Sequence, residues 1–129
     1  MKERGFVLLE SMLAVAIFAI GVLALGRCVS NCMAAERLKH EDALAGQVLA
    51  NRMAEIEGGA VLLTNAAPEI LKSPFDGMKL KESSGLLKMK NEKDQDLPGL
   101  FTVTLVVTWN SGGDPRQKAL TFYVLQNKQ

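Results

Sequence analysis

Glu10 is the residue of this sequence whose position could carry chemistry. It lies four residues after Phe6 in an apolar run, Phe6–Gly26, that reads FVLLESMLAVAIFAIGVLALG. A carboxylate within a membrane helix costs about 2.5–3.5 kcal/mol on insertion scales, and less near the end of the helix, where it can reach the interface. One interpretation is a tolerated interfacial carboxylate. The other is a group that must meet a positive partner in the apolar phase.

A positive partner arises if the chain is cut between Gly5 and Phe6. The cut creates a free amine on Phe6, at the N-terminus of a helix, and within one chain this amine stays near its own first turn. Between two parallel helices that are staggered along an axis, Glu10 of one chain can reach the amine of the next. Such a pair would neutralise both charges and fix the axial register of the two chains.

The apolar run has the length of a membrane-spanning helix. Its 21 residues extend roughly 31 Å as a helix, against about 30 Å for a bilayer core. Lys2 and Arg4 precede the run, so the positive-inside rule places the N-terminus in the cytoplasm and the rest of the chain outside. A cleavable signal peptide has a shorter apolar core, of about 7–15 residues, which disfavours that class and leaves a signal anchor.

The residues around the proposed cut resemble a known targeting signal. Lys-Glu-Arg-Gly, then Phe6, then Val-Leu-Leu-Glu and a long apolar helix are similar to the class III signal of type IV pilins and type II secretion pseudopilins. The resemblance implies that a prepilin peptidase cuts after Gly5 and methylates the new N-terminal residue, Phe6. It also implies that Glu10 is the assembly carboxylate. Val7 departs from the family, which most often has Thr there, so a hydroxyl contact is lost.

The helical pattern continues beyond the apolar run and becomes amphipathic. Apolar residues recur close to one helical face, and they are Leu38, Ala45, Leu49, Met53 and Ile56. Gly58-Gly59 is a C-terminal stop signal, so the sequence predicts one helix from about Phe6 to Glu57. We therefore divide the chain into a leader (1–5), a transmembrane helix (6–27), an amphipathic continuation (28–58) and a globular part (59–129).

The stretch 60–99 is interrupted by turn-forming residues, among them Pro68 and Pro74. Within it we predict a short helix near Ala67–Lys72 and a strand near Leu86–Lys90. The run Lys88–Asp96 is highly charged and mixed in sign, which predicts a solvated loop, with a partner-binding surface as the alternative.

The C-terminal third predicts an antiparallel hairpin over about residues 100–125. Apolar and polar residues alternate from Phe101 to Trp109, a Gly-rich turn follows, and alternation resumes from Leu120 to Val124. A hairpin alone is marginal, so it needs a further strand and a cover for its apolar face. The amphipathic helix supplies that cover, which predicts an α+β fold of a long N-terminal helix on a small antiparallel sheet.

The hairpin carries a second resemblance. The string VTLVVTWNSGGDPRQKALTFYVL is similar to the closing hairpin of the type II secretion minor pseudopilin I and of PilV-like minor pilins. Together the resemblances imply a pilin-like fold and a minor pseudopilin that spans the bacterial inner membrane once, with its C-terminal domain in the periplasm. The implied partners are other pilin-like subunits, the prepilin peptidase and the inner-membrane assembly platform.

Two other functions stay open at the level of sequence. The first is a minor pilin of a type IV pilus, active in motility, adhesion or DNA uptake. The second, of a different class, is a signal-anchored periplasmic binding domain that never assembles.

Other chemistry finds little support in the sequence. It has no nucleophile motif, no Gly-rich phosphate loop and no metal-ligand cluster, so we expect no enzyme, cofactor or metal site. A net charge of +1 gives no basic excess for nucleic acid. His40 lies among charged residues and is expected to be solvated. Cys28 and Cys32 are four apart, a poor geometry for a mutual disulfide, which leaves packing, an intermolecular disulfide or a lipidated thiol.

Overall fold

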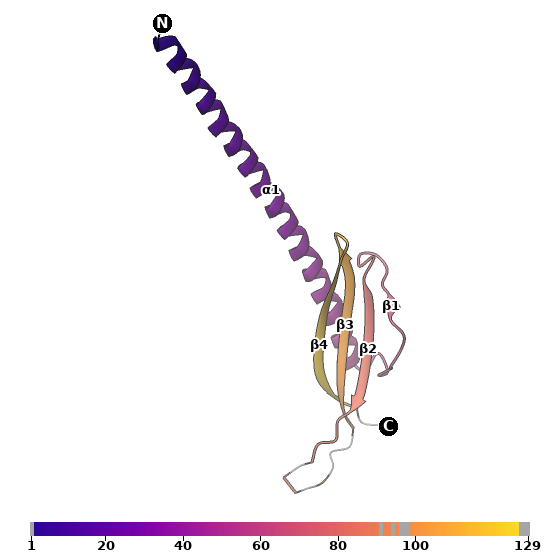
Figure 1. The fold of residues 1–129 in the computed structure, drawn as a ribbon. Coiled ribbons are helices and arrows are strands. Elements are labelled where there is room, and N and C mark those ends of the chain that lie inside the picture. Colours follow the sequence, from indigo (N-terminus) through magenta and orange to yellow (C-terminus); the bar gives the residue numbers. More distant parts are fainter. Residues whose placement is uncertain (1, 91, 94, 96–98, 127–129) are drawn as a thin grey trace. The chain divides into compact units, whose positions relative to one another are not determined.

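The computed structural model describes residues 2–90, 92–93, 95 and 99–126 of the chain. One long helix, α1, is followed by four strands, β1 to β4 (Figure 1). The chain divides into two compact units, Met1–Lys39 and His40–Gln129. The helix and the antiparallel sheet together confirm the predicted α+β class.

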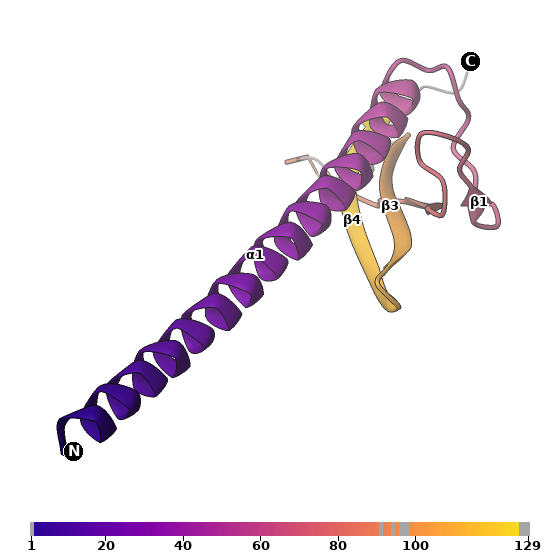
Figure 2. The ribbon, with the colours of Figure 1, turned by 90° about the horizontal axis from the view of Figure 1, so that it is seen from above.

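Helix α1 runs without interruption over Lys2–Glu57 (Figures 1 and 2). The predicted helix over Phe6–Glu57 is therefore confirmed, and Gly21 and Gly26 do not break it. No proline precedes Pro68 in the sequence, so no residue of α1 lacks the backbone N–H that an uninterrupted helix requires.

The predicted stop signal ends α1. Past Glu57 the backbone N–H of Ala60 donates to Glu55 O at 3.0 Å, and that of Gly59 donates to Ile56 O at 3.1 Å. This pair of bonds satisfies carbonyls at the helix end that have no partner within the helix. Gly59 has a φ of 70°, which a residue without a Cβ adopts at little cost.

The sheet has the order β1-β2-β3-β4, and all neighbouring strands are antiparallel. Its strands are β1 (Glu69–Ile70), β2 (Lys79–Leu86), β3 (Leu100–Ser111) and β4 (Asp114–Leu125). The last two form the predicted hairpin, with Leu105 opposite Leu120. Gly112 and Gly113 join them with φ values of 60° and 95°, the two positive values that a type I′ turn requires.

The core lies between the His40–Glu57 part of α1 and one face of the sheet. Its buried apolar side chains are Ala45, Val48, Leu49 and Ile56 from α1, Met78 just before β2, Leu80 from β2, Val103, Leu105 and Val107 from β3, and Phe122 from β4. The alternation read from the hairpin is thus confirmed. Of the helical positions that the sequence grouped together, Leu38 is instead 38% exposed, whereas Val48, which was not included, is buried.

Two predictions for the middle of the chain are wrong. Ala67–Lys72 is not a helix: Glu69–Ile70 pairs with the start of β2 as the short strand β1. The strand predicted at Leu86–Lys90 lies earlier, because β2 runs over Lys79–Leu86 and pairs along its length with β3. The described residues of the charged run Lys88–Asp96 are exposed; Asn91, Asp94 and Asp96 lie outside the described residues.

Candidate functional site

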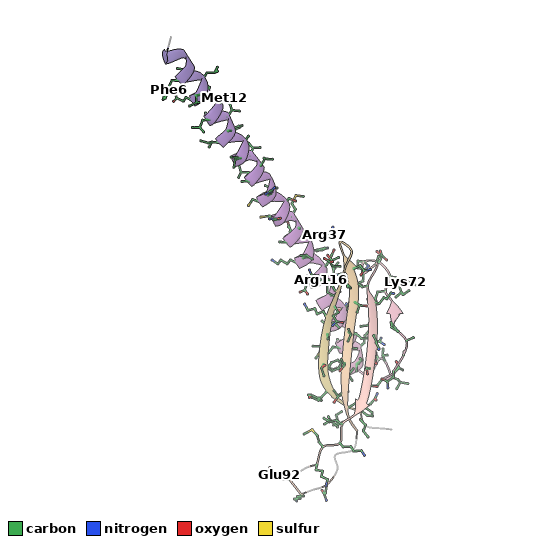
Figure 3. All side chains as sticks on the ribbon, viewed as in Figure 1. Phe6, Met12, Arg37, Lys72, Glu92 and Arg116 are labelled. Atoms are coloured by element: carbon green, nitrogen blue, oxygen red, sulfur yellow. The ribbon has the colours of Figure 1, made fainter. Side chains whose placement is uncertain are left out.

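The three residues that the sequence selected lie close together on α1. Gly5, Phe6 and Glu10 are all exposed, and the Phe6 side chain is 70% exposed. Figure 3 shows Phe6 near the N-terminal end of α1. Residues four apart on a helix share a face, so Phe6 and Glu10 are neighbours along one side of α1. In the uncut chain the Phe6 nitrogen belongs to a peptide bond.

Glu10 offers a carboxylate to the surroundings of this helix. Within the described part of the chain, its side chain has no hydrogen bond or ion pair. The neighbouring Ser11 differs, because its hydroxyl donates to Val7 O at 2.9 Å within the same helix. The Ser11 hydroxyl thus forms its hydrogen bond within its own helix, as is common for serine in helices. The Glu10 carboxylate, in contrast, is available to a group of another molecule.

The helix around Glu10 exposes an apolar surface. Every large apolar side chain from Phe6 to Val29 is between 51% and 72% exposed. By length and composition α1 is a candidate membrane span, and the described part of the chain holds one such helix. Exposed apolar patches of this extent mark a membrane or protein contact, because in water they would be costly.

The two cysteines and the histidine also lie on α1. Cys28 and Cys32 are both exposed and both free, so no disulfide joins them. His40 is exposed, as expected for a solvated residue.

A second group of polar residues, in the unit His40–Gln129, was not found from the sequence. Glu82 of β2 is buried, at 6% exposure, and its Oε2 accepts hydrogen bonds from Nε and Nη2 of Arg52 on α1 at 3.1 and 3.0 Å. Its Oε1 accepts the backbone N–H of Thr64 at 3.2 Å. Arg52 also donates from Nη1 to Glu55 at 3.0 Å.

These contacts set the pKa of Arg52. Desolvation by burial lowers this pKa, but the hydrogen bonds and charges of Glu55 and Glu82 outweigh it, so the net pKa lies above its ordinary value. Arg52 therefore stays charged, and the cluster ties α1, β2 and the loop between α1 and β1 to one another. The sequence signal that could have indicated this cluster is Glu82, an acidic residue at an inward-facing position of an alternating strand.

An exposed ion pair links the other edge of the sheet to α1. Lys118 of β4 donates from Nζ to Asp42 Oδ2 at 2.7 Å. Gly46 lies beside this lysine, and a Cβ there would lie 3.6 Å from Nζ, an ordinary van der Waals contact.

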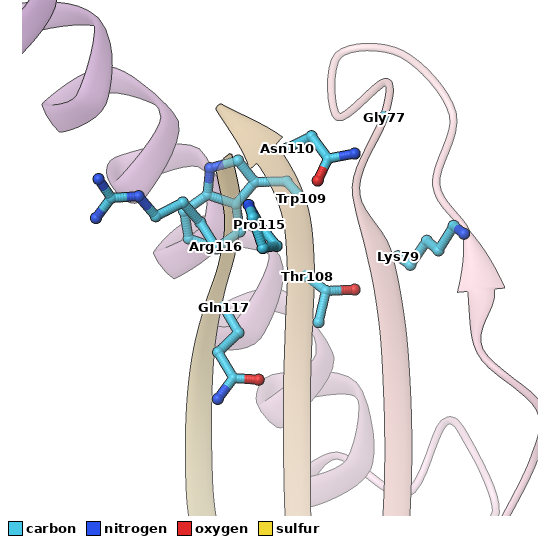
Figure 4. Close-up of a pocket in the computed structure, with 8 residues that line it drawn as sticks. All are labelled: Gly77, Lys79, Thr108, Trp109, Asn110, Pro115, Arg116 and Gln117. Atoms are coloured by element: carbon cyan, nitrogen blue, oxygen red, sulfur yellow. The ribbon is translucent and has the colours of Figure 1, made fainter. Parts of the chain in front are cut away.

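A shallow depression of about 540 Å³ lies near the turn of the hairpin (Figure 4). Its lining residues are Gly77, Lys79, Thr108, Trp109, Asn110, Pro115, Arg116 and Gln117. The charged ends of Lys79 and Arg116 point away from one another (Figure 4), and no acidic, histidine or cysteine side chain lines the depression. Among the described residues, the depression thus offers no carboxylate, imidazole or thiol for acid–base chemistry or metal binding.

Comparison of the chain with protein-family models, with curated proteins and with solved structures finds no match.

Proposed function

We propose that this chain is a minor pseudopilin of a type II secretion system, a structural subunit that joins a periplasmic pseudopilus through its N-terminal helix. One observation carries the proposal. Glu10 is an exposed carboxylate within the exposed apolar surface of a candidate membrane span, four residues after the predicted cleavage site Gly5/Phe6.

Assembly would give the Glu10 carboxylate a positively charged partner. Cleavage after Gly5 releases an amine on Phe6, which is then methylated and stays positively charged. In a staggered pair of parallel helices the amine of one subunit meets Glu10 of the next. The pair forms in the bilayer, where an isolated carboxylate costs up to about 2.5–3.5 kcal/mol, and less near the helix end where Glu10 lies, so an unassembled subunit is penalised relative to an assembled one.

The proposal includes the partners and the location of the chain. The subunit crosses the bacterial inner membrane once, with its N-terminus in the cytoplasm and residues 59–129 in the periplasm. It is cut by a prepilin peptidase and assembled with sister subunits at an inner-membrane platform. In this proposal the energy for secretion comes from a cytoplasmic ATPase and not from this chain.

Replacement of Glu10 tests the assembly step. We expect Glu10→Leu to insert into the membrane as the wild type does but to be lost from filaments. Both can be measured by membrane fractionation and by cross-linking to sister subunits. The matched control is Ser11→Ala, because the Ser11 hydroxyl bonds only to its own helix at Val7 O. If Glu10→Leu joins filaments as the wild type does, Glu10 is not the assembly residue. If the wild type itself joins no filament, the chain is instead a signal-anchored domain that does not assemble.

A minor pilin of a type IV pilus would use the same helix. A disulfide-bounded C-terminal region would favour that function, but both cysteines of the chain are free and lie on α1. A deletion strain separates the two: we expect loss of protein secretion, with twitching and transformation unchanged. The reverse result would assign the chain to a pilus.

A further inference from the structure

A cleft lies between α1 and the segment that leads from β1 to β2, and we call it the β1 cleft. It has a volume of about 210 Å³. Its lining residues are Val48, Asn51, Arg52 and Glu55 of α1, Glu69 of β1, Leu71 and Phe75 of the following loop, and Leu80 of β2. All belong to the unit His40–Gln129, so the cleft does not involve the candidate membrane span.

The interior of the β1 cleft is apolar. Val48 and Leu80 are buried, at 5% and 6% exposure, and both belong to the core. Leu71 and Phe75 are half-buried and pack against the same core. Such a surface fits an aliphatic chain or a planar ring-like group. Either group makes van der Waals contacts there and buries no polar atom that would lose a hydrogen bond to water.

The entrance of the cleft is polar and negative. Asn51, Glu55 and Glu69 line it and are exposed. Arg52 also lines it, and its guanidinium is paired both with buried Glu82, at 3.0 Å between Nη2 and Oε2, and with Glu55, at 3.0 Å between Nη1 and Oε2. The three carboxylates of Glu55, Glu69 and Glu82 outnumber this one cation, which leaves the cleft with a negative balance.

The nearby lysines do not cancel this balance. Lys79 and Lys81 flank Leu80 in β2 and are exposed. Successive side chains of a strand point to opposite faces of a sheet, so both lysines lie on the face away from the cleft. Lys72 follows Leu71 but does not line the cleft.

We propose that the β1 cleft binds an arginine side chain presented by a partner polypeptide. The aliphatic stem of arginine covers the apolar interior, its planar guanidinium stacks on Phe75, and its N–H groups donate to Glu55 and Glu69. A purely apolar side chain would desolvate these carboxylates without giving them a donor, and an anion would be repelled. The combination of an apolar interior and an acidic entrance thus selects a long cationic side chain.

The test uses the full chain in neutral detergent micelles, with labelled Val and Leu methyl groups observed by NMR. The probe is the peptide acetyl-Ala-Arg-Ala-amide, and its neutral isostere has citrulline in place of arginine. We expect the arginine peptide to shift the methyl signals of Val48 and Leu80 in a saturable manner. Binding of the citrulline peptide is expected to be at least about tenfold weaker, a difference of about 1.4 kcal/mol.

Variants of the chain make the test specific. Glu69→Gln and Glu55→Gln are expected to weaken binding of the arginine peptide several-fold. Glu57→Gln makes the same charge change at an exposed residue of α1 that does not line the cleft, and we expect it to leave binding unchanged. The signal of Trp109, the only tryptophan, reports that each variant is folded.

Three results would overturn this proposal: no saturable shift at Val48 or Leu80, equal binding of the two peptides, or equal weakening by Glu57→Gln. None of them bears on cleavage at Gly5 or on Glu10, so this proposal and the proposed function can fail separately.

Discussion

Arg52 donates two hydrogen bonds to a single oxygen of Glu82, from Nε at 3.1 Å and from Nη2 at 3.0 Å. The two residues are 30 positions apart in the chain, one on α1 and one on β2. Because the other oxygen of Glu82 accepts the N–H of Thr64 at 3.2 Å, the carboxylate holds three segments together. A buried charge of this kind is tolerated only while its partners are in place.

Removal of the Arg52 charge is therefore expected to destabilise the sheet unit. We predict that Arg52→Met lowers the free energy of unfolding by about 2–4 kcal/mol, because it leaves Glu82 buried and unpaired. Urea titration of the full chain in micelles, followed by Trp109 fluorescence, measures this change. Removal of both charges, in Arg52→Met/Glu82→Leu, is expected to recover much of the loss. A double variant as unstable as the single one would contradict this explanation.

The raised pKa of Arg52 gives a prediction for pH. A cation whose folded-state pKa is raised contributes fully below its ordinary, strongly basic pKa and loses the contribution only as pH rises above that pKa. The difference in unfolding free energy between wild type and Arg52→Met should thus stay constant from about pH 7 to pH 10. A fall of that difference within this range, in urea titrations at each pH, would contradict the assignment.

The exposed pair of Lys118 and Asp42 should contribute far less. Although Nζ and Oδ2 are 2.7 Å apart, the two side chains are 38% and 58% exposed, so water and salt screen their attraction. We predict that Lys118→Met lowers the free energy of unfolding by at most about 1 kcal/mol, and less at high salt. The same urea titrations at two salt concentrations test this, and a loss as large as that of Arg52→Met would refute it.

Gly99 precedes β3 at a position that only glycine fits. Its φ is 89°, and a Cβ there would lie 2.7 Å from the backbone oxygen of Gln126. Gly99→Ala should therefore destabilise the sheet by about 1–3 kcal/mol, from backbone strain and this clash. Gly85→Ala, in β2, is the control, because a Cβ at Gly85 meets nothing within 4 Å. Equal thermal unfolding of the two variants would contradict this.

The centre of the sheet should be the most sensitive part of the core. Leu105 has no exposed surface, and its replacement by Ala removes contacts on all sides. We expect a loss of about 2–5 kcal/mol for Leu105→Ala. Leu125→Ala, at a side chain that is 72% exposed, should change stability by less than about 0.5 kcal/mol. A similar loss of unfolding free energy in both variants would show that Leu105 does not lie at the centre of the core.

Strong periodicity explains which elements were predictable. In β3 the buried residues Val103, Leu105 and Val107 alternate with Thr and Val, so the hairpin can be read directly from the sequence. The single long helix was predictable because its apolar run passes into an amphipathic pattern without a proline. The candidate site residues Gly5, Phe6 and Glu10 lie on that one element, and their roles stay a prediction.

The middle of the chain was not predictable from local patterns. Strand β2 places Glu82 at an inward position, where a sequence pattern expects an apolar residue, and it contains Gly85, a residue type that is typical of turns. Its identity as a strand depends on its pairing with β3, and the position of Glu82 depends on Arg52. Both are contacts between distant segments, which override local propensity.

The mass of the mature N-terminus, obtained by mass spectrometry of the chain isolated from its native membrane, tests the proposed assembly through Glu10 most directly. We expect a wild-type chain that begins at methylated Phe6 and a Gly5→Ala chain that keeps residues 1–5. A wild-type chain that begins at Met1, without methylation, would leave Glu10 without the amine that it is proposed to meet and would refute the proposed function.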